Sequence, residues 1–119
     1  MASEILERKV ELAWLVAFYG GMLTEKQRQV LAMHCEEDMS LGEIAAEAGI
    51  SRQGVHDLLT RAAHRLLDME EKLGMADKFT RRSQGMEQCL AALRAKRYAE
   101  CETMLDALIR LDQEESNGL

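Results

Sequence analysis

The chain has 119 residues, which is room for one domain or for one compact module with a small appendage. Its composition, 47% hydrophobic and 30% charged, is typical of a folded globular protein and excludes an intrinsically disordered one. The net charge of −6 excludes binding to nucleic acid or anionic membranes through overall charge, so any nucleic-acid site has to be a local patch.

The first predicted element is a single helix over residues 3–19, with Ser3 as its cap and with Gly20 and Gly21 after its end. The second half of this helix, residues 12–19, is apolar on every side. A helix of this kind must be covered all round. It is therefore either the central core helix or a contact surface for a partner subunit, and the sequence leaves both interpretations open.

A capping box formed by Thr24 and Gln27 predicts the next helix, because each side chain can bond the backbone N–H of the other at a helix start. This helix is expected to end near Cys35. Three side chains are candidates for its inner face: Val30, Leu31 and His34.

The residues from Ser40 onward predict a helix-turn-helix. Ser40 and Glu43 form a second capping box, and the short helix that they begin stops at Gly49, which can adopt the left-handed conformation of a helix end. Almost at once, Ser51 can cap the next helix, which is expected over residues 52–73. Two helices joined by so short a glycine turn have the organisation of a helix-turn-helix.

The helix predicted over residues 52–73 separates an apolar face from a polar one. The apolar face repeats at the helical period: Val55, Leu58, Leu59, Ala62, Leu66 and Met69. In a helix-turn-helix the start of the second helix enters the major groove of DNA, and the first helix crosses the backbone. The residues that could contact nucleic acid in this way are Lys26, Arg28, Ser51, Arg52, Gln53, His56, Asp57, Thr60 and Arg61.

These candidates differ in chemistry. Arg52 and Gln53 can donate to the edges of guanine and adenine, respectively, and a helix start capped by Ser51 offers backbone N–H groups to a phosphate. The side chains that could touch phosphates are those of Lys26 or Arg28, His56, Thr60 and Arg61. Asp57 repels phosphate and could instead accept from a cytosine amine or pair with a neighbouring Arg. Acids outnumber cations over residues 24–72, which predicts weak DNA affinity unless two copies bind together. The alternative to a nucleic-acid site is that these residues form only a solvated polar face of the bundle.

Residues 75–113 predict a helical hairpin packed on a helix-turn-helix domain of residues 1–74, and residues 114–119 predict a flexible tail. The first helix of the hairpin could be interrupted near Gly85, and the second starts near Tyr98. The side chains expected to face inward are Met86, Cys89, Leu90, Leu93, Cys101, Met104, Leu105, Leu108, Ile109 and Leu111.

Several classes of function find no support in the sequence. The three cysteines are odd in number and lie at no metal-ligand spacing, so we expect no metal site, no disulfide framework and a cytoplasmic location. The pair Gly20-Gly21 lacks the Lys-Ser/Thr of a phosphate loop, and no nucleophile stands beside a base, so neither an enzyme nor a cofactor is expected. The most apolar stretch, residues 12–23, is about half as long as a membrane crossing requires, so no membrane insertion is expected.

Parts of the sequence resemble region 4 of the bacterial sigma-70 factors. The runs that carry this resemblance are 23–28 (LTEKQR), 40–45 (SLGEIA) and 51–57 (SRQGVHD). Together with Arg61 and residues 71–73, they are more similar still to the YlxM family of small bacterial proteins, over about residues 12–83. The chain departs from the sigma pattern at Gly54 and Asp57, where sigma factors usually carry polar or basic residues.

The resemblance implies an all-α, sigma-70 region 4-like helix-turn-helix bundle, here with an N-terminal apolar helix and a C-terminal helical hairpin. It also implies a regulatory or accessory role in the signal recognition particle pathway. Two functions follow: a regulator that docks Arg52 and Gln53 into a DNA major groove, or a module that contacts the protein or RNA of that particle without sequence-specific DNA binding. Separately from the resemblance, the apolar residues 12–19 and the apolar C-terminal helix predict a homodimer. Twofold symmetry would be needed to present paired reading helices.

Overall fold

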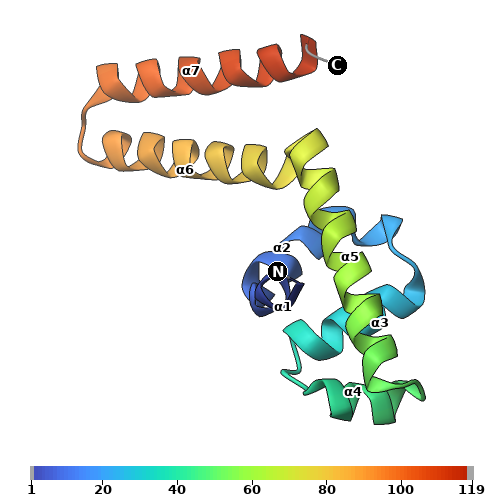
Figure 1. Cartoon of the computed structure of the whole chain (residues 1–119). Helices are drawn as coiled ribbons and strands as arrows, with labels where there is room; N and C mark the ends of the chain where they lie inside the picture. Colours follow the sequence, from blue (N-terminus) through green and yellow to red (C-terminus); the bar gives the residue numbers. More distant parts are fainter. Residues whose placement is uncertain (1, 118–119) are drawn as a thin grey trace. The chain divides into compact units, whose positions relative to one another are not determined.

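The computed structural model describes residues 2–117, with side chains described for residues 4–114. Its elements, drawn in Figure 1, are α1 (Ala2–Glu7), α2 (Lys9–Tyr19), the 3₁₀ turn η1 (Gly20–Met22), α3 (Glu25–Cys35), α4 (Leu41–Ala48), α5 (Arg52–Leu73), α6 (Met75–Arg94) and α7 (Tyr98–Asn117). The predicted all-α class is confirmed. The chain divides into two compact units, Met1–Ala76 and Asp77–Leu119. Over the described residues, no helix is long and apolar enough to span a membrane.

The helix predicted over residues 3–19 is two helices. Arg8 leaves the helical conformation, with φ −81° and ψ 53°, and its N–H donates to the carbonyl oxygen of Ile5 at 3.1 Å. Ser3 consequently lies inside α1 and not before its start. The turn at Arg8 separates α1, whose Leu6 is buried in the core, from α2. No glycine or proline marks the break, and at this point Arg8 Nε donates to Glu11 Oε2 at 2.6 Å, three residues further along the chain.

The first unit has one apolar core, to which α2, α3, α4 and α5 contribute. Helix α5 contacts the other three (Figure 1). The largest fully buried side chains are Leu12, Leu15, Tyr19, Val30, Leu31, Ile44, Val55, Leu59 and Leu66. The apolar half of α2 is not covered on every side, because Trp14 is 42% exposed and Ala17 is exposed as well. The expectation that its apolar half must be covered all round is therefore not met within the described chain.

The start of α6 is capped by two side chains from earlier elements. The Tyr19 hydroxyl donates to Glu70 Oε1 at 2.7 Å and accepts from the N–H of Met75 at 3.0 Å. The same Glu70 oxygen accepts from the N–H of Ala76 at 3.0 Å. These bonds satisfy N–H groups that a helix start cannot pair internally. Burial, with the neighbouring Glu70 carboxylate, raises the pKa of Tyr19, so its hydroxyl keeps the proton that it donates.

The second unit is a helical hairpin of α6 and α7, with Lys96 in the left-handed conformation (φ 62°) at its turn. Helix α6 is not interrupted at Gly85. A Cβ atom at Gly85 would lie 2.5 Å from Leu108 Cδ2, so this glycine allows the two helices to approach closely. Helix α7 continues to Asn117, beyond the expected end near Gln113, and the rest of the predicted tail lies outside the described residues.

The apolar side chains of the hairpin are less buried than the periodicity predicts. Cys89 is buried as expected. Five residues that were expected to face inward are exposed instead: Met86, Leu90, Leu93, Leu105 and Ile109. The prediction fails because each helix of a two-helix unit has one neighbour, whereas the apolar arc on α6 and α7 is wide enough for two.

Candidate nucleic-acid interface

The corner between α4 and α5 is built as the sequence predicts. The capping boxes at Thr24 and Ser40 are both present, and they begin α3 and α4. Gly49 ends α4 in the left-handed conformation, with φ 71° and ψ 31°, and its N–H donates to Ala45 O at 2.9 Å. Two residues later, Ser51 Oγ accepts from the N–H of Gly54 at 2.9 Å and caps α5.

Replacement of Gly49 by alanine is expected to lower the free energy of unfolding by about 1 kcal/mol. No atom lies within 4 Å of the added Cβ, so the effect comes from the positive φ alone. Gly21 is the matched control, because it also has open space and no positive φ, and Gly21→Ala should change stability little. Urea unfolding measures both variants, and equal effects at the two sites would contradict the left-handed corner.

The first turns of α5 separate their faces as predicted. Val55 and Leu59 are fully buried against the rest of the first unit. Among the candidate side chains, those of Arg52, Gln53, Asp57 and Arg61 are exposed, and those of His56 and Thr60 are half-buried. The structure thus presents a row of polar groups at the capped start of the second helix of the helix-turn-helix, which is the position that reads base edges in proteins of this architecture.

Two of these polar groups bind each other. Gln53 Nε2 donates to Asp57 Oδ1 at 2.9 Å, and His56 Nδ1 lies 3.8 Å from the same oxygen. The carboxylate therefore holds the Gln53 amide in one orientation. The bond to Asp57 uses one of the two N–H donors of this amide, so the second N–H and the Gln53 Oε1 remain for pairing with a base.

Arg52 lies across the start of α4. A Cβ atom on Gly42 would be 3.8 Å from Arg52 Nε, so the glycine leaves space for the side chain to run past α4. In the same turn of α4, hydrogen bonds from Ser40 lower the pKa of Glu43, which keeps this carboxylate ionised. The structure thus places a guanidinium and an anionic cap at the same edge of the helix-turn-helix.

The two candidates on α3 are placed differently. Lys26 Nζ donates to Ala48 O at 3.1 Å, so the ammonium stabilises the C-terminal end of α4 next to the corner. Arg28 faces α2, where its Cδ would be 3.8 Å from a Cβ on Gly20, and it lines a small pocket between α2 and α3. The structure therefore brings Lys26, but not Arg28, to the corner.

Thr60 offers its hydroxyl poorly to a ligand. Its Oγ1 is buried and has no hydrogen-bond partner among the described residues. A phosphate contact at Thr60 consequently requires a rotation of the side chain. The sequence could not show the burial of Thr60 Oγ1, because tertiary packing encloses this oxygen. It could not show the contact of Lys26 with Ala48 either, because the two residues are 22 positions apart in the chain.

Comparison with known proteins identifies the family. The model of the UPF0122 family, which groups helix-turn-helix proteins described as YlxM / p13 like, matches residues 6–106. The chain belongs to the UPF0122 family. The resemblance to YlxM proteins that the sequence motifs carry is therefore confirmed, and so is the helix-turn-helix.

UPF0122 relatives from several bacteria are similar over most of their length. A UPF0122 protein of Halalkalibacterium halodurans is 37% identical over 108 residues, which cover 91% of this chain and 97% of that protein. One of Geobacillus kaustophilus is 39% identical over 106 residues, covering 89% of this chain and 94% of the relative. One of Clostridium botulinum is 40% identical over 91 residues, covering 76% and 84%.

The part of this UPF0122 chain that the structure describes brings together no three His, Cys, Asp or Glu side chains able to hold a metal ion. What the first turns of α5 offer is hydrogen bonding: a guanidinium, an amide and a carboxylate on one exposed surface. These groups recognise base edges and phosphates in proteins that read nucleic acids.

Proposed function

We propose that this UPF0122 protein is a regulatory or accessory protein of the signal recognition particle pathway that binds nucleic acid through the first turns of α5. The observation that carries the proposal is the exposure of Arg52 and Gln53 at a helix start fixed by Gly49 and Ser51. In this proposal Arg52 and Gln53 contact base edges, and Lys26 and Arg61 stay close to the phosphates. The protein acts in the cytoplasm as a homodimer, which presents two copies of α5.

Binding of a DNA duplex is expected to weaken steeply as salt rises. Two phosphate contacts per chain, from Lys26 and Arg61, make four in the dimer, and these would give a slope of about −4 in a plot of the logarithm of the affinity against the logarithm of the salt concentration. Fluorescence anisotropy of a labelled duplex, titrated at several salt concentrations between about 50 and 200 mM, measures this slope. An affinity that does not change with salt would contradict binding through phosphates.

A second candidate function is a module that binds the signal recognition particle through its protein or its RNA, without reading DNA sequence. The acidic charge of the chain favours it, because this charge weakens binding to duplex phosphates. The Gln53–Asp57 bond also favours it, because it uses one N–H of the amide that would read a base edge. Crosslinking in the native cell, followed by sequencing of the bound nucleic acid and identification of the bound proteins, separates the two. Chromosomal DNA sites support the regulator, whereas particle RNA or protein that is retained by an Arg52→Ala variant supports the module.

A further inference from the structure

One face of the hairpin is apolar and exposed. We call it the hairpin face, and its members come from both helices: Met86, Leu90, Leu93, Leu105 and Ile109. On α6, Met86, Leu90 and Leu93 follow one another at intervals of about one helical turn, so they form one stripe along the helix. Met86 lines the same shallow groove as Leu105 and Ile109, so the stripes of α6 and α7 lie on the same side of the hairpin.

The hairpin has almost no core of its own. Within residues 77–114 of the hairpin, the buried side chains are those of Cys89 and Ala92. Units of about 40 residues bury too little apolar surface to be stable without further contacts. In a four-helix bundle each helix packs against two neighbours and uses a wide apolar arc, and such an arc is what α6 and α7 present.

The two helices of the hairpin carry opposite charge. Helix α6 has four Lys or Arg against two Asp or Glu, and α7 has one Arg against six Asp or Glu. A second hairpin can cover the hairpin face in two symmetric ways. One places each α6 on the α6 of the other copy, which also sets two acidic α7 helices against each other; the other places each α6 on α7 of the other copy, which pairs opposite charges.

We propose that the hairpin face is the interface of a homodimer, in which α6 of each chain packs against α7 of the other and the four helices form an antiparallel bundle. The twofold axis then runs parallel to the helices, so each residue keeps its height along the bundle in both chains. Residues of α6 therefore lie level with the same residues of α7 in the other chain as in their own chain. This register of α6 against α7 is fixed by the ion pair of Arg82 and Asp112 at 3.0 Å and by the approach of Gly85 to Leu108.

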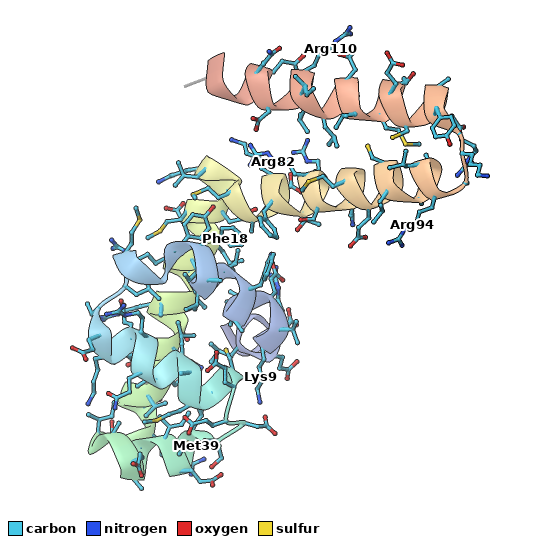
Figure 2. All side chains as sticks on the ribbon, turned by 180° about the vertical axis from the view of Figure 1, so that it is seen from behind. Lys9, Phe18, Met39, Arg82, Arg94 and Arg110 are labelled. Atoms are coloured by element: carbon cyan, nitrogen blue, oxygen red, sulfur yellow. The ribbon has the colours of Figure 1, made fainter. Side chains whose placement is uncertain are left out.

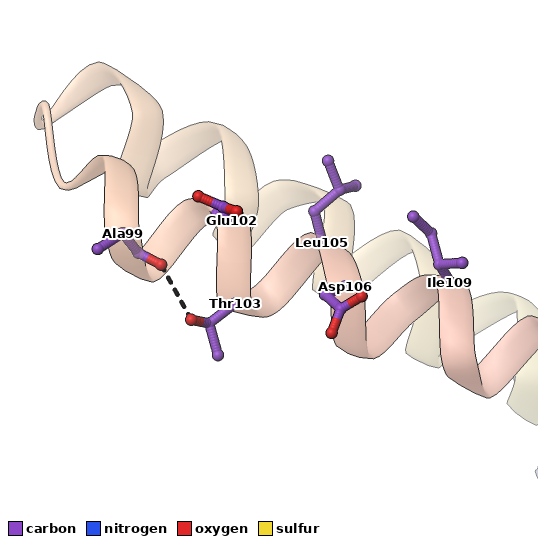
Figure 3. Close-up of a pocket in the computed structure, with 6 residues that line it drawn as sticks. All are labelled: Ala99, Glu102, Thr103, Leu105, Asp106 and Ile109. Carbon is purple, nitrogen blue, oxygen red and sulfur yellow. Dashed lines mark hydrogen bonds between the residues drawn. The ribbon is translucent and has the colours of Figure 1, made fainter.

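This register brings Arg94 near Glu102 of the second copy. Figure 2 shows Arg94 pointing away from α7 of its own chain, whereas Arg82 points between the two helices. Figure 3 shows Glu102 on α7 beside Leu105 and Ile109, at the edge of the hairpin face. Each of the two contacts between α6 of one chain and α7 of the other would therefore hold one Arg94–Glu102 pair.

Two charge reversals test this pairing on the full-length chain. Arg94→Glu alone and Glu102→Arg alone should each raise the dimer dissociation constant about tenfold, because each creates two like-charge contacts per dimer. An equimolar mixture of the two variants should form a heterodimer with wild-type affinity, because each pair of residues 94 and 102 is then opposite in charge. Analytical ultracentrifugation of each variant and of the mixture measures the constants.

Leu105→Glu tests the apolar part of the face. This change should raise the dissociation constant about 100-fold or more, because it buries a carboxylate in the bundle. Val10→Glu is the matched control: it places the same charge on an exposed apolar residue of α2, and the dimer should persist. Circular dichroism shows whether each variant keeps its helices, and the heterodimer rescue does not depend on that comparison.

The possible outcomes separate this interface from the rest of the proposed function, on whose homodimer it rests. Wild-type protein that stays monomeric at every concentration overturns the homodimer, and the hairpin face is then covered by its own chain or by another protein. If Val10→Glu disrupts the dimer and Leu105→Glu does not, the proposed hairpin interface is wrong. The proposal that the protein is a homodimer then still stands, with its interface elsewhere. Nucleic-acid binding is measured separately, and its failure leaves the sedimentation result unaffected.

Discussion

Replacement of Leu59 by alanine is expected to lower the free energy of unfolding of the first unit by about 2–5 kcal/mol. Leu59 is fully buried where α5 contacts α2, α3 and α4, so the truncation leaves a cavity that the surrounding helices can fill only in part. The protein has one tryptophan, Trp14, and it lies on α2 of this unit. Its fluorescence during urea unfolding therefore reports on the first unit.

Leu73→Ala provides the control for this measurement. Leu73 lies on the same helix but is exposed, so the same change in side chain should alter stability by about 0.5 kcal/mol or less. An effect of Leu59→Ala as small as that of Leu73→Ala would show that the core is not the one described.

Replacement of Arg52 by alanine is expected to reduce discrimination between the preferred DNA sequence and random DNA by about 1–3 kcal/mol, which is roughly a 5- to 150-fold loss. The side chain is exposed at the start of α5, so the substitution should leave the fold unchanged. Selection of bound duplexes from a random pool, followed by titration of the selected duplex and of a random duplex, measures the effect. Gln53→Ala should give a loss of similar size at a different base pair.

Arg110→Ala is the matched control for Arg52→Ala. Arg110 is an exposed arginine on α7, where it pairs with Asp106 at 3.0 Å. Its removal changes the net charge by the same amount, and Arg110 lies outside the segment that forms the helix-turn-helix. If Arg110→Ala and Arg52→Ala change both affinities equally, Arg52 contributes only general charge, and the proposed base contact is wrong.

The local part of the fold could be predicted from the sequence. Caps such as Ser40 with Glu43 and turns such as Gly49 depend on residues that are near neighbours in the chain, so the pattern is visible without coordinates. The burial of Val55 and Leu59 follows from a helical period that one core satisfies. This is why the helix-turn-helix and the exposed start of α5 were both predicted.

Features that depend on distant partners could not be predicted in this way. The break at Arg8 contains no glycine or proline to mark it in the sequence, and the burial of Thr60 Oγ1 depends on tertiary packing. Likewise, the periodicity of α6 and α7 shows that Met86 and Leu105 belong to an apolar face, but it does not show what covers that face. Sequence periodicity identifies a surface, and only the arrangement of neighbouring helices decides whether it is buried.

The helix caps also bear on how the first unit folds. At the starts of α3, α4 and α5, the side chain of Thr24, Ser40 or Ser51 bonds a backbone group three residues away, so these contacts close very short loops. Loops of this length lose little chain entropy on closure, and chains rich in such contacts reach the native state quickly. Helix nuclei can thus form at three places in the nascent chain before the distant bond between Tyr19 and Glu70 joins α2 to α5.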